Sequence, residues 1–304
     1  CFTVSDSESV LLAEEEIVFQ DAWVIDRVGQ YGRRAVHTDA LEARLVERTE
    51  FLPQTEKGVL LSDGTTAHWR SVQGAEDGWL KEDGLRGGYA HYSITSDSSR
   101  VMLLDATGHR MVYVNGQPRI GDVYMTNMVR IPVFIKAGTN SFLFHGARGR
   151  LRARLIPIEQ PIMLDLRDVT LPDLIMDMSC DTWGAVVVVN ATTSPLEDMV
   201  MVATIENQKS MLTSIAAVPP LSIRKTPFRI RSVPVTHSGD LRLTLGLQKD
   251  GHEVEESESN VMLRVRHSYQ TYKKTFVSTI DGSVQYYAVR PASSLNTEES
   301  DRNK

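Results

Sequence analysis

Short apolar runs with a period of two recur from about residue 57 to near the end of the chain. Residues 88–95 (GYAHYSIT) alternate between apolar and polar side chains, and Gly, Asn or Asp separates one run from the next. Successive side chains of a β-strand point to opposite faces, so this period predicts strands with one buried face. Short strands with turn residues between them are typical of antiparallel sandwiches. The pattern therefore predicts an all-β chain.

Local signals place several elements in the first half. Asn115-Gly116 follows the run 111–114 and accepts the positive φ of a tight hairpin turn. Pro132 interrupts the run 129–135 and lacks an N–H group, which predicts an edge strand or a bulge. Residues 39–47 (DALEARLVE) fit a short helix or an amphipathic strand, and the pattern does not separate the two.

Four arginines alternate with small or apolar residues at the end of this half. Arg148, Arg150, Arg152 and Arg154 would share one face of a strand. Two interpretations remain open for this row. It is the solvated face of a sheet, or it is a site for an acidic glycan or another acidic partner.

A length of 304 residues suits two domains better than one, and Pro157 and Pro161 mark the predicted boundary between them. Beyond it, the valine run of residues 183–190 (WGAVVVVN) predicts a strand buried on both faces. Further strands are predicted at 199–205, 228–233, 241–247 and 261–265. Together they predict a seven-strand sandwich of immunoglobulin type.

A last pair of runs, 275–279 and 284–289, flanks Asp281-Gly282 and predicts a hairpin that begins a third unit. The predicted division is therefore a flexible lead-in at 1–20, a first sandwich at 21–157, a second at 158–268, and a linker with the first hairpin of a truncated domain at 269–304.

Charge and composition exclude several classes. Lys and Arg total 33 against 39 Asp and Glu, so the net charge of −6 gives no reason to expect a nucleic-acid partner. No apolar run approaches the roughly 20 residues that cross a bilayer, so no membrane span is expected. The cysteines are Cys1 and Cys180, and a disulfide between them stays open. Cys1 is either a lipidated mature N-terminus or a truncation point.

Catalytic and metal motifs are missing from the sequence. It contains no G-x-S-x-G pentapeptide, and His252-Glu253 is not followed by the second histidine of an HExxH motif. Asp173, Asp177 and Asp181 would share a helical face at spacing four, but Pro172 and the strand that follows indicate a loop. We therefore expect no catalytic residue, metal site or cofactor in this chain, and the sequence does not settle structural calcium.

Large aromatic residues provide the candidate ligand-binding site. Exposed rings in the turns of the first sandwich could stack on sugars, while core or rim packing is the alternative. The candidates are Trp69, Trp79, Tyr89, Tyr92 and Tyr124.

Two stretches resemble known families. Residues 112–155, with VYVNG, GDVY, IPVFIKAGTNSFLF and HGARGRL, resemble the galactose-binding-like jelly-roll domains of bacterial extracytoplasmic hydrolases. Residues 275–291 (TFVSTIDGSVQYYAVRP) resemble the segment before the first catalytic strands of prolyl oligopeptidase-like α/β-hydrolases from bacteria such as planctomycetes.

The resemblance implies a galactose-binding-like jelly roll followed by an immunoglobulin-like or fibronectin III-like sandwich. It also implies a downstream catalytic domain, so that the full protein would be an extracytoplasmic serine hydrolase or peptidase. This chain would then be its non-catalytic accessory region, which shields, orients or recruits substrate. A carbohydrate-binding module and a structural or adhesive β-protein are the alternatives.

Overall fold

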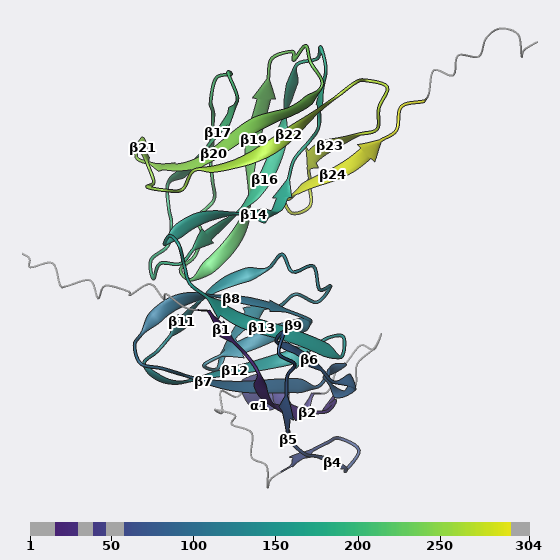
Figure 1. Cartoon of the computed structure of the whole chain (residues 1–304), viewed down its shortest axis with the longest axis vertical. Coiled ribbons are helices and arrows are strands. Elements are labelled where there is room, and N and C mark those ends of the chain that lie inside the picture. Colours follow the sequence, from purple (N-terminus) through teal and green to yellow (C-terminus); the bar gives the residue numbers. More distant parts are fainter. Residues whose placement is uncertain (1–15, 30–38, 47–57, 293–304) are drawn as a thin grey trace, which may run out of the picture. The chain divides into compact units, whose positions relative to one another are not determined.

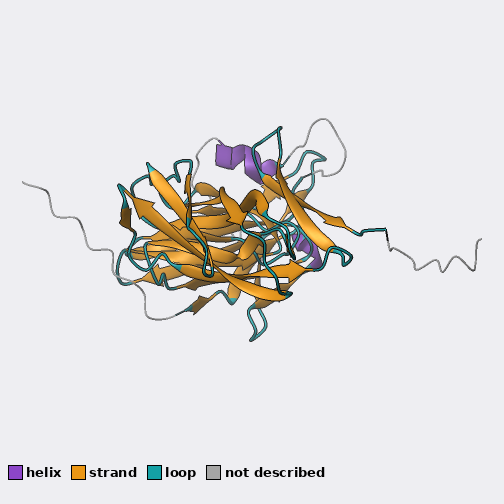
Figure 2. Ribbon diagram, turned by 90° about the horizontal axis from the view of Figure 1, so that it is seen from above, coloured by secondary structure: helices purple, strands orange, loops and turns teal. Residues whose placement is uncertain are grey.

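The computed structural model describes residues 16–29, 39–46 and 58–292 of the chain. The chain divides into two compact units, Cys1–Glu159 and Gln160–Lys304. Each unit is built almost entirely from strands, which Figure 2 draws in orange. The all-β fold with two antiparallel sandwiches is confirmed, and the division lies close to the boundary predicted after residue 157. Neither α1 (Ala40–Val46) nor the 3-10 helix η1 (Asp83–Leu85) has the length or apolar character that a membrane crossing needs.

One layer of the first unit is a five-stranded sheet in the order β1-β13-β8-β11, with β6 also paired to β13 (Figure 1). These strands span Ile17–Val18, Arg150–Ile156, Arg100–Thr107, Arg130–Ile135 and Trp79–Lys81. Pro132 lies in β11, at the edge of the sheet, as predicted.

The other layer is a six-stranded sheet in the order β10-β9-β12-β7-β2-β5. Its strands span Gln117–Ile120, His109–Val114, Gly138–Gly146, Tyr89–Ser96, Asp21–Ile25 and Arg70–Gln73. Asn115 and Gly116 have φ angles of 49° and 80° and form the two-residue turn between β9 and β10. The hairpin predicted from this dipeptide is confirmed.

Aromatic rings fill the space between these two sheets. The ring centroid of Phe19 lies 4.9 Å from that of Phe142 and 5.1 Å from that of Tyr92. Phe19 is 1% exposed, and β1 pairs with β13. The described residues 16–20 therefore belong to the sandwich, which corrects the lead-in predicted for 1–20. Residues 1–15 lie outside the described part of the chain.

A second, smaller core lies on the outer side of the six-stranded sheet. Helix α1 (Ala40–Val46) begins after Asp39, whose carboxylate accepts hydrogen bonds from the amides of Leu41 and Glu42 at 2.8 Å and 2.9 Å. This N-cap resolves the described part of that segment, residues 39–46, in favour of the helix. Leu41 packs there with Val59 of β3 (Val59–Leu60), which pairs with β4 (Thr66–Ala67).

The second unit pairs a three-stranded sheet, β14-β16-β19, with a sheet in the order β15-β22-β20-β17-β18, to which β21 adds beside β20. The first three strands span Ile162–Thr170, Cys180–Asn190 and Ser222–Ser232. The others span Leu174–Ile175, Ser259–Arg266, Gly239–Lys249, Met199–Ile205, Met211–Ser214 and His252–Glu253. The predicted burial of the valine run in β16 is confirmed, since residues 184–190 are all buried.

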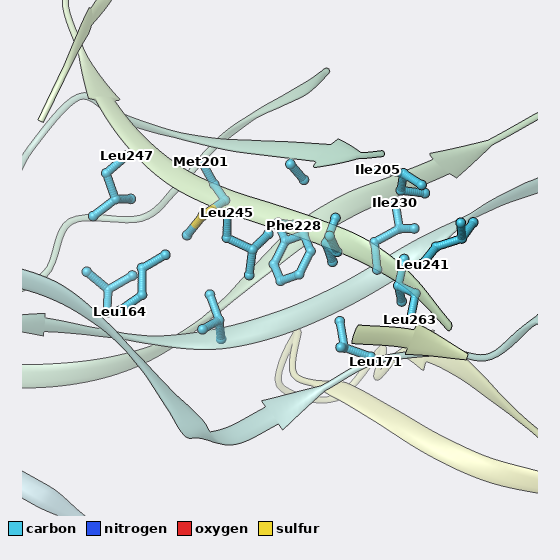
Figure 3. Close-up of a cluster of buried hydrophobic side chains, with 14 of the residues drawn as sticks. Leu164, Leu171, Met201, Ile205, Phe228, Ile230, Leu241, Leu245, Leu247 and Leu263 are labelled. Atoms are coloured by element: carbon cyan, nitrogen blue, oxygen red, sulfur yellow. The ribbon is translucent and has the colours of Figure 1, made fainter. Parts of the chain in front are cut away.

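Leucines and β-branched residues from both sheets form the core of this unit. Figure 3 shows Phe228 and Ile230 of β19 among Leu241, Leu245 and Leu247 of β20. All members of this cluster come from residues 164–265, so the second unit encloses a core of its own.

The last hairpin joins β23 (Tyr272–Val277) to β24 (Val284–Val289). It forms a two-stranded sheet that packs against β14 and β16. Asp173 and Lys273 bond reciprocally: the Lys273 amide donates to the Asp173 carboxylate at 2.8 Å, and the Asp173 amide donates to the Lys273 carbonyl at 2.9 Å. The hairpin predicted to begin a third unit is therefore attached to the second. The tail from residue 293 lies outside the described residues.

Candidate functional site

The five aromatic candidates fall into two groups. Trp69, Tyr89 and Tyr92 are buried, with 4%, 0% and 2% of their surface exposed. Tyr92 lies between the sheets, whereas Trp69 and Tyr89 belong to the smaller core beside α1. A ligand cannot stack on rings that the protein already covers. This corrects the expectation for these three residues, which pack the cores instead.

The other two candidates, Trp79 and Tyr124, lie beside the arginine row. Trp79 of β6 is half-buried, and the guanidinium carbons of Arg150 and Arg152 lie 5.4 Å and 5.1 Å from its ring centroid. Tyr124 is 79% exposed, and the guanidinium carbon of Arg148 lies 5.9 Å from its ring. At such distances a ring face attracts a cation.

Strand β13 confirms the predicted face for Arg150, Arg152 and Arg154, whereas Arg148 lies before the strand begins. Leu151, Ala153 and Leu155 of this strand are buried and alternate with these arginines. Across the β6–β13 pair, Lys81 lies opposite Arg150 and Trp79 lies opposite Arg152, so these side chains share one face of the sheet. We call this surface the basic strip, which consists of Lys81, Arg148, Arg150 and Arg152 with the rings of Trp79 and Tyr124.

Among the residues that the structure describes, acidic side chains neutralise only the far end of the arginine row. Arg154 donates to the Asp105 carboxylate at 2.8 Å and to Glu16 at 3.1 Å, while Arg130 also donates to Asp105 at 3.2 Å. The Asp105 side chain is 2% exposed. Burial disfavours the charge on Arg154, yet its two carboxylate partners raise the pKa of Arg154 above its ordinary value. This end of the row is structural.

The arginines of the basic strip, in contrast to Arg154, contact uncharged groups. Within the described residues, no carboxylate lies within 4.0 Å of the cationic groups of the strip. The Nε atoms of Arg148 and Arg150 donate to the carbonyl oxygen of Val123 at 3.0 Å and to the sulfur of Met125 at 3.4 Å. These contacts orient the two guanidinium groups without cancelling their charge.

A carboxylate beneath the strip organises the loop that carries Tyr124. Asp122 is 4% exposed and accepts hydrogen bonds from the Thr107 hydroxyl at 2.7 Å and from the amides of Asn127 and Thr126 at 2.7 Å and 3.0 Å. Desolvation opposes ionisation, but these bonds together lower the pKa of Asp122 below its ordinary value. The ionised carboxylate therefore fixes the loop that contacts Arg148 and Arg150.

A serine and a histidine meet on the outer side of the six-stranded sheet. The Nε2 atom of His91 lies 2.9 Å from the Ser141 hydroxyl oxygen. The other ring nitrogen of His91 is buried without a hydrogen-bond partner in the described residues. Burial lowers the pKa of His91 to about 4. A catalytic triad needs an acid on that second nitrogen to orient the ring, so this pair is not assembled as a triad.

A separate polar cluster lies nearby under α1. The Tyr89 hydroxyl donates to Asp39 at 2.9 Å, and the ring of His145 stacks on Tyr89 with centroids 4.5 Å apart. Burial is the main cause that lowers the pKa of His145 to about 4. Asp39 also caps α1, so the cluster ties the helix to the sheet.

The three aspartates at spacing four, Asp173, Asp177 and Asp181, have separate structural roles. Asp173 is buried and holds the β23–β24 hairpin, Asp177 has a φ of 62° in a turn, and Asp181 pairs with Arg229 and Arg231. The loop expected from Pro172 is confirmed. In the described ranges, no three His, Cys, Asp or Glu side chains are placed to hold a metal ion together.

Cys180 lies half-buried in β16, and burial raises the pKa of its thiol.

Sequence analysis missed Lys81 of the strip and Asp122, which fixes the loop beside it. Lys81 stands two residues after Trp79, so the period of two could have placed both on one face. Asp122 is followed by Thr126 and Asn127 in a segment of turn residues, which could have suggested a carboxylate that caps a loop.

No family model and no curated protein sequence matches this chain. Similar folds occur among solved structures. An exo-chitosanase from Amycolatopsis orientalis has 12% identity and a TM-score of 0.35, over 90% of this chain and 36% of the other. A β-glucuronidase from Bacteroides uniformis has 11% identity and a TM-score of 0.38, over 90% and 34%.

A transglutaminase from red sea bream, with 9% identity and a TM-score of 0.26, matches over 69% of this chain and 40% of that protein. Likenesses at this level concern the β architecture and carry no argument about function. The chain spans 34% to 40% of the length of these three proteins.

Proposed function

We propose that this chain is the non-catalytic accessory region of a larger extracytoplasmic hydrolase and that its first unit recruits substrate to a catalytic domain of the same polypeptide. The observation that carries the proposal is the basic strip, where rings and loop atoms hold cationic groups in place on a sheet face. Groups that are ordered before binding lose little conformational entropy when a ligand arrives. The strip therefore suits a ligand that lies across the sheet.

The catalytic partner that we propose is a serine hydrolase or peptidase of the prolyl oligopeptidase-like class. Its support is the resemblance of residues 275–291 to the segment before the first catalytic strands of those enzymes. These residues include most of the β23–β24 hairpin, which Asp173 and Thr275 tie to the second unit. A hairpin fixed in this way would set where a following domain begins.

An independent carbohydrate-binding module is the second candidate, and the same basic strip favours it. The two candidates agree on binding and differ in whether a catalytic domain belongs to the polypeptide. Reading the coding DNA beyond Lys304 separates them. A downstream G-x-S-x-G segment supports the serine hydrolase, and an open reading frame without any hydrolase domain contradicts it.

Binding is tested on the purified chain with a panel of neutral and charged polysaccharides in affinity electrophoresis. We expect at least one polysaccharide to retard the chain. We also expect no turnover of ester, peptide or aryl-glycoside substrates. Failure of every polysaccharide to bind, or turnover that a point substitution in this chain abolishes, contradicts the proposal.

A further inference from the structure

We propose that the basic strip selects an anionic polysaccharide, one with carboxylate or sulfate groups along its length, over a neutral chain of the same backbone. This inference rests on the proposed function, because it specifies the ligand class of the surface that recruits substrate.

The two ends of the arginine row differ in the groups that partner their charges. Arg154 shares the carboxylates of Asp105 and Glu16, so its charge is already balanced. Arg150 and Arg152, on the same face of the same strand, have ring partners in place of carboxylates. An anion at the strip therefore meets charges that no carboxylate of the described residues compensates.

The arginines of the strip retain hydrogen-bond donors for a ligand. A guanidinium has five N–H donors, and a ring contact through its face consumes none of them. Arg148 and Arg150 each use Nε for a loop atom, and their Nη groups make no hydrogen bond with a residue that the structure describes. Paired Nη donors match the two oxygens of a carboxylate or sulfate.

The spacing of the cations in the strip suits an extended ligand. Alternate residues of a strand stand about 7 Å apart on one face. Arg150 and Arg152 are related in this way, Lys81 lies across from Arg150, and Arg148 adds a cation beyond the end of β13. A row of this kind fits repeated charges on an extended polymer better than a single small anion.

The strip is also fixed before any ligand binds. Asp122 holds the loop that places Val123, Tyr124 and Met125 against Arg148 and Arg150. Thr107, which donates to Asp122, lies opposite Arg152 in the β8–β13 pair. Asp122 is therefore a positioning residue for the strip.

Net charge favours a polysaccharide over a nucleic acid. The chain carries −6, and four cations are fewer than the roughly six to ten phosphate contacts of a typical nucleic-acid interface. Asp77, whose carboxylate accepts from the Trp79 amide at 3.2 Å, adds a negative charge beside the strip that would repel a densely charged duplex. A polysaccharide with one charge per sugar or fewer suffers less of this repulsion.

Matched ligands test the inference on the whole chain. Polygalacturonate is compared with its fully methyl-esterified form, dextran sulfate with dextran, and duplex DNA serves as the competing polyanion. We expect at least about ten-fold tighter binding to one charged form than to its neutral counterpart. We also expect that binding to weaken as sodium chloride rises from about 50 mM to about 500 mM.

Substitutions then locate the site. The triple variant Arg148→Ala, Arg150→Ala, Arg152→Ala should bind the charged form at least about ten-fold more weakly than the unaltered chain. Its matched control is Arg224→Ala, Arg242→Ala, Arg264→Ala, which removes three exposed strand arginines of the second unit and should bind normally. Melting temperatures and near-UV circular dichroism show that both variants are folded.

Each remaining outcome is decisive. Equal binding to charged and neutral forms, full binding by the first triple variant, or tighter binding to DNA overturns the inference. If only neutral polysaccharides bind, the recruiting function stands and the inference fails. If no polysaccharide binds, both fail. Preference for polygalacturonate or for dextran sulfate tells whether carboxylate or sulfate is the group recognised.

Discussion

Asp105 shows how one buried carboxylate can organise a sheet face. Its side chain is 2% exposed and accepts from both Arg130 and Arg154. Removing one member of such a group leaves the others charged, partly buried and poorly compensated.

We therefore expect Asp105→Asn to lower the free energy of unfolding by about 3 kcal/mol. Asp168→Asn is the control, because Asp168 pairs with Lys225 at the surface, where such a pair contributes about 1 kcal/mol or less. Urea denaturation measures both. Equal losses for the two variants would contradict the structural role of Asp105.

Buried histidines make the stability of the first unit depend on pH. His109 is 2% exposed, packs edge-on against Phe144, and has a pKa lowered to about 4, mainly by burial. In the unfolded chain its pKa is near the ordinary 6.5. Between these values the unfolded chain binds a proton that the folded chain does not, so stability falls as pH decreases from about 6.5 to about 4.

The variant His109→Leu should reduce this dependence by about 1.4 kcal/mol per pH unit within that window. Urea denaturation at pH values from 4 to 8 measures it. Above pH 7 the difference between the variant and the unaltered chain should be constant, which provides an internal control. An unchanged slope below pH 6.5 would show that His109 does not titrate as described.

Sequence analysis located the residues whose conformation or strand face follows from their immediate neighbours in the chain. Asn115-Gly116 needs positive φ, and the alternation around Arg150 and Arg152 follows from strand geometry. The burial of Tyr89 and Tyr92 could not be read locally. They lie on opposite faces of β7, and both are covered because other elements pack on both sides of that strand.

At the scale of elements, long apolar strands were predicted well and polar ones were missed. Met199–Ile205 was predicted with its observed bounds. Strand β14 was missed because Ile162–Thr170 mixes Asp and Arg with its apolar residues and has an irregular register between Asp165 and Thr170. A bulge interrupts the period on which the prediction depends.

The β23–β24 hairpin offers a test at this scale, because Asp173 accepts from the amide of Lys273. The variant Asp173→Ala should speed hydrogen exchange of that amide about ten-fold or more, since a bond to a charged acceptor is lost. Exchange in the β16–β19 ladder should not change. Asp181→Ala, at an exposed carboxylate of the same unit, is the control. Unchanged exchange at Lys273 would show that the hairpin is held by other contacts.

At the scale of the whole molecule, the chain consists of two units with separate cores. Every buried residue that the structure describes in the core cluster of the second unit lies between 164 and 265. We therefore expect residues 160–304, expressed alone, to unfold cooperatively and to keep a near-UV circular dichroism signal. A gradual transition with strong binding of a hydrophobic dye would contradict the independence of this unit.

The division into two sandwiches was predictable because strand period, turn residues and Pro157 and Pro161 are all visible in the sequence. The basic strip was predictable only in part. Its arginines follow from the alternation of residues along the strand. Their uncharged partners lie on β6 and in the loop after Asp122, and only the fold brings these two segments to β13.

The central claim is that the strip on β6 and β13 binds an extended anionic chain. Its most direct test is to titrate the isotope-labelled chain with polygalacturonate fragments and to follow the backbone amide signals by nuclear magnetic resonance. The account predicts that shifts concentrate at residues 79–81, 122–125 and 148–152. Shifts confined to the second unit, or none at saturating ligand, would contradict it.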